Sequence, residues 1–169
     1  NLGIAYNNQG NYTKAIESYK KAIELKPDYA LAYYNLGIAY NDQGNYTKAI
    51  ESYKKAIELD PDYALAYYNL GIAYNNQGNY TKAIESYKKA IELKPDYALA
   101  YYNLGIAYNN QGNYTKAIES YKKAIELKPD YALAYNNLGI AYNNQGNYTK
   151  AIESYKKAIE LKPDYALAY

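Results

Sequence analysis

Apolar and polar positions alternate along the chain in blocks, and the first part of each block predicts a helix. In one block the largely apolar run Tyr29–Tyr40 predicts a helix for which Asp28, directly after a proline, is a good N-cap. This helix is expected to extend to about Gln43. Gly44 then suits the left-handed residue that commonly ends a helix. The block therefore opens with one helix followed by a short turn.

The second part of each block predicts another helix, which starts at Asn45 and ends near Leu59 because the residue before Pro61 is disfavoured in helical geometry. Its apolar residues recur at helical spacing and predict one buried stripe. The stripe consists of Ala49, Ile50, Tyr53, Ala56 and Ile57. The block is therefore a helical hairpin.

The other side of the second helix carries charged residues and predicts a solvated outer face. Glu51 is expected to pair with Lys55, in the favourable acid-before-base order. Lys54 and Glu58 have the same four-residue spacing and are expected to pair as well.

The block recurs with a strict period of 34 residues, which indicates a solenoid. A single hairpin buries too little apolar surface to offset its conformational entropy, so we expect the hairpins to stack. Three columns vary, at Asp42, Asp60 and Asn136. We predict one solenoid over residues 1–169, with a truncated first repeat at 1–29, full repeats at 30–63, 64–97, 98–131 and 132–165, and the start of a further first helix at 166–169.

The repeated positions resemble the tetratricopeptide repeat (TPR) in all five copies. Tyrosine takes the place of the signature Trp and Phe of that family. The matching positions in one copy are Tyr33, Leu36, Gly37, Tyr40, Ala49, Tyr53, Ala56 and Pro61. The resemblance implies an all-α fold, an α-solenoid in which antiparallel helix pairs form a right-handed superhelix. It also implies that first helices line a concave groove and that the chain is a scaffold for peptides or proteins.

If first helices line a groove, one face of each should contact a ligand, because its positions recur at spacings of three, four and seven residues. The opposite face is used for packing, so the first helix is apolar on both sides and invites a covering partner, extended or amphipathic. The alternative is that the groove walls cover one another. The predicted groove residues are Leu31, Tyr34, Asn35, Ile38, Asn41, Asp42, Leu65, Tyr68, Asn69, Ile72, Asn75, Asn76, Leu99, Tyr102, Asn103, Ile106, Asn109, Asn110, Leu133, Asn136, Asn137 and Ile140.

One asparagine in each repeat forms a column along the predicted groove, at Asn35, Asn69, Asn103 and Asn137. An amide both donates and accepts, so such a ladder could pair with the backbone of an extended peptide, as ladders do in some TPR superhelices. The alternative is that each amide bridges neighbouring groups of the protein itself. Both interpretations remain open from the sequence.

Other TPR modules grip the C-terminal carboxylate of chaperones with a clamp of Lys, Asn and Arg. The matching positions here carry Tyr34, Ile38, Asn69, Leu99 and Asn103, of which only Asn69 fits. We therefore predict no binding of chaperone tails.

The composition removes most catalytic chemistry, because the chain has no Cys, His or Arg and all 28 of its aromatic residues are Tyr. Ser52 lies three residues before Lys55, but on an outer helix with no expected pocket. We expect no enzymatic activity, no cofactor and no metal site.

Charge and the length of apolar segments bear on whether the chain binds nucleic acid or membranes. The net charge of +2 and the placement of lysines on outer helices predict no nucleic-acid binding. No apolar run approaches the roughly 20 residues of a membrane span, and no signal-peptide layout is visible, so a cytoplasmic protein is expected. The sequon Asn45-Tyr46-Thr47 is interpreted as helix-start chemistry and not as a glycosylation site.

Two further expectations concern the ends and the second repeat. No polar capping helix follows the last repeat, which leaves Ile152 partly uncovered and suggests head-to-tail self-association as an alternative, structural function.

Asp42, Asp60 and Asp62 make the second repeat more acidic than the others, which would suit a basic ligand group or reflect neutral variation.

Overall fold

The structure is a computed structural model, and it describes residues 1–164 and 166–168. Within these residues the regular secondary structure is helical throughout, which confirms the all-α prediction. The helices are α1 (Leu2–Asn8), α2 (Tyr12–Leu25), α3 (Ala30–Asp42), α4 (Tyr46–Leu59), α5 (Ala64–Asn76), α6 (Tyr80–Leu93), α7 (Ala98–Asn110), α8 (Tyr114–Leu127), α9 (Ala132–Asn144), α10 (Tyr148–Leu161) and a short 3-10 helix, η1 (Ala166–Ala168).

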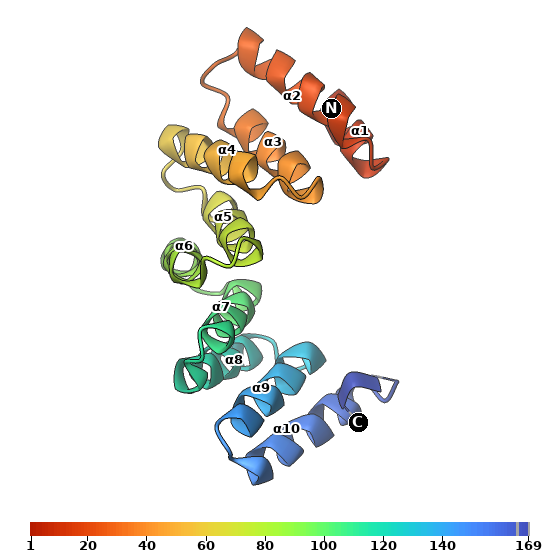
Figure 1. The fold of residues 1–169 in the computed structure, drawn as a ribbon, viewed down its shortest axis with the longest axis vertical. Helices are drawn as coiled ribbons and strands as arrows, with labels where there is room; N and C mark the ends of the chain where they lie inside the picture. Colours follow the sequence, from red (N-terminus) through yellow and green to blue (C-terminus); the bar gives the residue numbers. More distant parts are fainter. Residues whose placement is uncertain (165, 169) are drawn as a thin grey trace. The chain divides into compact units, whose positions relative to one another are not determined.

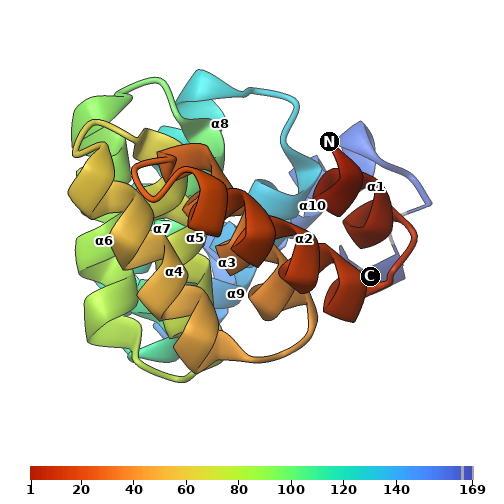
Figure 2. The same cartoon turned by 90° about the horizontal axis from the view of Figure 1, so that it is seen from above.

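The chain divides into two compact units, Asn1–Leu93 and Lys94–Tyr169. In the first unit the helices pack as the pairs α1/α2, α3/α4 and α5/α6, and in the second as α7/α8 and α9/α10 (Figure 1). Successive pairs pack through α2 on α3 and α4 on α5 in the first unit, and through α8 on α9 in the second. Figure 2 shows α4 and α6 to the left of α3 and α5. The predicted stack of helical hairpins is confirmed within each unit.

Gly44 ends the turn after α3 in the left-handed conformation, with φ of +81°. The backbone N–H of Gly44 donates to the carbonyl of Asn41 at 2.9 Å, and that of Asn45 donates to the carbonyl of Tyr40 at 2.8 Å. These bonds satisfy carbonyls that the end of a helix leaves free. The glycine predicted to end the first helix therefore does so.

Asn45 caps the second helix, as the sequence predicts. Its side-chain oxygen accepts a hydrogen bond from the backbone N–H of Lys48 at 3.2 Å, three residues on. This bond occupies one of the free N–H groups at the helix start. The interpretation of the sequon as helix-start chemistry is confirmed, and α4 ends at Leu59, before Pro61.

Asp28 is not the N-cap of α3, so this prediction was wrong. The N-cap is Tyr29, and no side chain makes a capping hydrogen bond at the start of the helix. The backbone N–H of Tyr29 donates to the carbonyl of Lys26 at 3.2 Å, which closes a β-turn with Pro27 in its second position. Asp28 is the third residue of this turn and therefore lies outside the helix start.

The ion pairs of the outer face also differ from those predicted. Lys55 pairs with Glu58, three residues on, at 2.7 Å between Nζ and Oε1, and not with Glu51. Lys54 extends over the ring of Tyr74 in the next repeat, 5.9 Å from the ring centre. Both lysines therefore have partners, but the four-residue spacing did not identify them.

The core of each unit is formed by the predicted stripe of the second helices together with the packing face of the first. Ala49, Tyr53 and Ala56 of α4 are almost fully buried, and Ile57 is half-buried. Leu36 of α3 is buried as well. At the chain end, Ala166–Ala168 form a single 3-10 turn, and Tyr169 of the predicted further helix lies outside the described residues. No helix in the described part of the chain is both long and apolar enough to cross a membrane.

Candidate functional site

The predicted groove residues lie on the first helices α3, α5, α7 and α9, and hydrogen bonds join successive first helices within each unit. In the first unit the side chain of Asn69 donates to the hydroxyl of Tyr34 at 2.9 Å. In the second unit Asn137 donates to the hydroxyl of Tyr102 at 3.0 Å. Each bond joins two predicted groove positions of adjacent repeats. We call the side of the first helices that carries the predicted groove residues the first-helix face.

A column of leucines is the most exposed apolar feature of the first-helix face. The four side chains are 41 to 47% exposed, although they belong to helices that are otherwise well packed. A leucine this exposed contributes little to the core and much to the surface. Leu31 and Leu65 lie in the first unit, and Leu99 and Leu133 in the second.

The isoleucine column is less open than the leucine column. Ile38, Ile72 and Ile106 are half-buried, and Ile140 is exposed. They are therefore available for contact only along part of their surface.

The tyrosine column serves packing more than surface. The ring of Tyr34 lies 4.9 Å from that of Tyr63 and 6.0 Å from that of Tyr53, between centres. Tyr68 is buried in the same column, whereas Tyr102 is half-buried. Burial raises the pKa of Tyr34, so its hydroxyl stays protonated and accepts from Asn69. The sequence placed these rings on the groove, but most of their area faces protein.

The asparagine ladder is already engaged with the protein. The amide nitrogen of Asn69 donates to Tyr34 and also to the backbone carbonyl of Leu65 at 3.1 Å. This pairing matches the alternative in which each amide bridges neighbouring groups. The amide oxygen of Asn69 has no donor among the described residues, so it remains open as an acceptor. Asn35 and Asn103 are half-buried at equivalent positions.

Asn136 takes the place of the column tyrosine in the last repeat, and it is only 4% exposed. Its amide nitrogen donates to the side-chain oxygen of Asn137 at 3.3 Å. Its own oxygen is buried without a hydrogen-bond partner among the described residues. Asn136 therefore adds almost nothing to the surface, and the sequence offers no signal for its burial other than the column it occupies.

A second set of amides joins the C-terminal ends of the first helices. Asn7 donates to the carboxylate of Asp42 at 3.1 Å in the first unit, and Asn144 donates to Asn109 at 3.4 Å in the second. The side-chain oxygens of Asn41 and Asn75 are buried without a partner among the described residues. The remaining predicted groove residues of this end, Asn76 and Asn110, are exposed.

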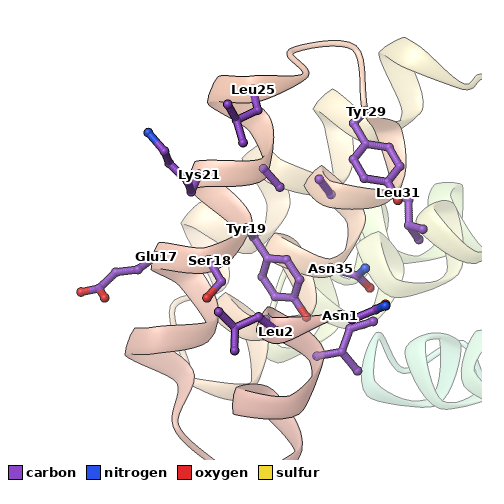
Figure 3. Close-up of a pocket in the computed structure, with 14 residues that line it drawn as sticks. Asn1, Leu2, Glu17, Ser18, Tyr19, Lys21, Leu25, Tyr29, Leu31 and Asn35 are labelled. Atoms are coloured by element: carbon purple, nitrogen blue, oxygen red, sulfur yellow. The ribbon is translucent and has the colours of Figure 1, made fainter.

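An apolar hollow of about 520 Å³ opens beside the first repeat, between α1, α2 and α3 (Figure 3). Leu2, Tyr19, Leu25 and Leu31 contribute to its lining. We assign this hollow no ligand.

The side chains considered for catalysis have structural partners. The hydroxyl of Ser52 is buried and donates to the backbone carbonyl of Lys48 at 2.8 Å. The described residues include no group of three or more acidic, histidine or cysteine side chains placed to hold a metal ion.

Comparison with known families gives matches along most of the chain. A TPR repeat model matches residues 3–44, 39–78 and 73–112, and a tetratricopeptide repeat model matches residues 96–164. No curated protein matches the chain significantly.

Solved structures of other proteins have the same fold. The chain aligns with a crystal structure of MamA at 38% identity and a TM-score of 0.91, over 98% of this chain and 97% of that one. It aligns with YrrB, described as a TPR protein with an unusual peptide-binding site, at 28% identity and a TM-score of 0.84, over 98% and 86% of the two chains. MamA from Desulfovibrio magneticus RS-1 aligns at 25% identity and a TM-score of 0.90, over 98% and 93%. The chain belongs to the tetratricopeptide repeat family.

Proposed function

We propose that the chain is a protein-interaction scaffold that binds an extended peptide segment along the first-helix face of each unit. The observation that carries this proposal is the leucine column, which leaves one large apolar side chain open in each of the four full repeats. Proteins of this family and fold are typically scaffolds and not enzymes. The proposal therefore requires neither catalysis nor a cofactor.

The spacing of the leucines suits a particular ligand conformation. The helices α3 and α5 contact one another, and packed helices have axes about 8–10 Å apart. One turn of a polyproline II segment advances about 9 Å in three residues. A ligand in this conformation would bring every third side chain to the next leucine, from Leu31 to Leu65. Apolar residues at every third position are thus the expected ligand pattern.

One amide of the column, that of Asn69, supports binding of a backbone beside those side chains. The oxygen of Asn69 is open as an acceptor, while its nitrogen is held by Tyr34 and Leu65. A fixed acceptor of this kind can accept a hydrogen bond from a backbone N–H of an extended peptide, whatever side chain that peptide residue carries. The description of YrrB names a peptide-binding site in a protein of this fold, which agrees with the proposal.

The test replaces the leucines while leaving the core intact. Leu31→Ser with Leu65→Ser changes the first unit, and Leu99→Ser with Leu133→Ser changes the second. These exposed positions are preferable to Ile38, which is half-buried. A polar or charged substitution at Ile38 would disturb the packing of the helix as well as the surface. The probe is a peptide of about 12 residues with leucine at every third position. The control peptide has the same composition, with the same number of leucines placed at every second position of one part of its sequence.

Fluorescence anisotropy should show preferential binding of the first peptide, and each double variant should weaken it about tenfold, because apolar contact with two leucines is lost. The matched control is Glu51→Ser with Glu85→Ser, which changes the outer face and should leave affinity unchanged. Equal affinity of the leucine variants and the unchanged chain would rule out the first-helix face as the binding surface.

A second candidate function is head-to-tail self-association, favoured by the exposed face of α10. Ile152 is 54% exposed, whereas its counterpart Ile50 is 8% exposed because α5 packs on it. A first helix from another copy could cover Ile152 in the same way. Sedimentation over a range of concentrations tests this candidate: association should be lost in Ile152→Asp, and a monomer at every concentration would exclude it.

A further inference from the structure

The first-helix face repeats almost without change, and this leaves the position of a bound peptide undetermined. A ligand shifted by one repeat meets the same side chains again, so neighbouring positions have nearly equal free energies. Asp42 is the exception. It is the only charged residue among the predicted groove positions, and its counterparts Asn8, Asn76, Asn110 and Asn144 are neutral.

We infer that Asp42 fixes the position of the bound peptide by pairing with a lysine or arginine of the ligand. This inference rests on the proposed function, and it names the ligand more closely: an extended segment with apolar residues at every third position and a basic residue at one end. The remaining contacts supply affinity, and Asp42 selects which repeat receives which part of the ligand.

The surroundings of Asp42 leave its charge available to a ligand. The residue is exposed, and one carboxylate oxygen, Oδ2, accepts from Asn7 at 3.1 Å. Its other oxygen has no donor among the described residues. The ion pairs of the described residues join lysines and glutamates of second helices, and Asp42 belongs to none of them. A neutral amide donor leaves the full negative charge in place.

The position within α3 strengthens the negative potential at Asp42. It is the last residue of the helix, where the free carbonyls already make the end negative. An acid there is unfavourable for helix stability and favourable for a cation. Asp42 therefore offers a cationic side chain both its own charge and that of the helix end.

The contact that Asp42 makes with the preceding first helix does not by itself require a charge. In the second unit Asn144, the counterpart of Asp42, donates to Asn109, the counterpart of Asn7, so this bond runs in the opposite direction to the bond from Asn7 to Asp42. A neutral residue in this column can therefore also contact the preceding first helix. What aspartate adds is the charge.

The experiment moves the charge by one repeat within the first unit. Asp42→Asn removes it, and Asp42→Asn combined with Asn76→Asp transfers it from the end of α3 to the end of α5. Both variants should fold, because each residue type already occupies this column in another repeat. The probe is the peptide with leucine at every third position, with lysine at one end and a photoreactive benzophenone at the other. Its control peptide has glutamine in place of lysine.

Cross-linked sites identified by mass spectrometry give the position of the peptide. On the unchanged chain the lysine peptide should label one repeat preferentially, in Asp42→Asn the labels should spread over several repeats, and in the double variant they should move by one repeat. The unchanged chain should bind the lysine peptide about two- to fivefold more tightly than Asp42→Asn does, as expected for an exposed ion pair. This difference should decrease with added salt.

The outcomes separate the two proposals. If the peptide binds and the leucine variants weaken it, but the labels are the same with and without Asp42, only the inference on Asp42 is overturned. The same follows if the glutamine peptide labels the unchanged chain as the lysine peptide does. If the peptide binds none of the proteins, the proposed function fails and this inference fails with it.

Discussion

Gly37 of α3 lies directly against the ring of Tyr53 of α4. A Cβ atom at Gly37 would lie 2.5 Å from Cε1 of that ring, far closer than van der Waals contact. Tyr53 is one of the largest fully buried side chains, so its ring has little freedom to move away. The same approach recurs between Gly71 and Tyr87. Each hairpin is therefore closed by a glycine that provides space for a tyrosine.

Gly37→Ala should destabilise the chain by about 1–3 kcal/mol, because the added methyl group overpacks the contact with Tyr53. Helix propensity alone predicts the opposite sign, since alanine is favoured over glycine inside a helix by roughly 1 kcal/mol. Urea unfolding followed by circular dichroism measures the difference. In a Tyr53→Leu background the same substitution should cost less, and an undiminished cost would show that the ring is not its cause.

Gly44→Ala should destabilise by about 1 kcal/mol through backbone strain alone, because Gly44 has φ of +81° and an added Cβ would meet no atom within 4 Å. Gly44→Asn should cost less, since asparagine tolerates the left-handed region better than alanine. Comparison of the two unfolding midpoints checks the prediction. Equal midpoints for the asparagine and alanine variants would contradict the role of φ.

Asn45→Ala should cost about 1 kcal/mol, because the side chain that accepts from the backbone N–H of Lys48 is lost. Asn45→Asp keeps an acceptor at the N-cap and should retain most of the stability. Both variants remove the asparagine of the sequon, so the pair separates the cap from any effect of glycosylation. A loss of stability in the aspartate variant as large as in the alanine variant would argue against the cap.

Stability should fall at alkaline pH because folding holds tyrosines in their neutral form. Burial raises the pKa of Tyr63 and of Tyr131 to about 12, and that of Tyr53 further still. A group whose pKa is higher in the folded state stabilises the fold fully below its ordinary value near 10 and loses this contribution as the pH rises through the raised value. The urea midpoint should therefore be flat below about pH 9 and decline above 10.

A matched pair of variants checks the source of the alkaline effect. Tyr53→Phe removes a buried phenol and should make the decline less steep, whereas Tyr148→Phe changes an exposed ring and should leave it unchanged. Ultraviolet absorbance of ionised tyrosine should show exposed groups titrating first and the remainder ionising with unfolding. Equal slopes for all three proteins would contradict the prediction.

The hairpins could be predicted from the sequence because their signals are local. Gly44 and Asn45 act within a few residues, and the structure uses both as expected. The prediction for Asp28 failed for a local reason too, since the β-turn with Pro27 competes with the cap and prevails. Where two local signals overlap, the sequence alone does not decide between them.

The first-helix face was harder to predict, because its details depend on contacts between residues about one repeat apart. The 34-residue period places Tyr34 and Asn69 in adjacent repeats. It does not show that the hydroxyl of Tyr34 lies within hydrogen-bonding distance of the Asn69 amide. Nor does it show that the tyrosine column is largely consumed by packing, or that Leu65 stays open beside it. These outcomes depend on the relative rotation of neighbouring hairpins, which no pattern within one hairpin encodes.

The hydrogen bonds between hairpins, such as Asn69 to Tyr34 and Gln77 to Thr47, each join a residue to the adjacent repeat and to nothing beyond it. Removing any 34 consecutive residues from the interior would bring equivalent donors and acceptors together again, whereas removing 33 would misalign the donors and acceptors on the two sides of the deletion. The chain can therefore gain or lose whole hairpins during evolution without requiring a new type of contact between repeats. Its length is free to change in steps of one repeat, while the chemistry of each junction stays the same.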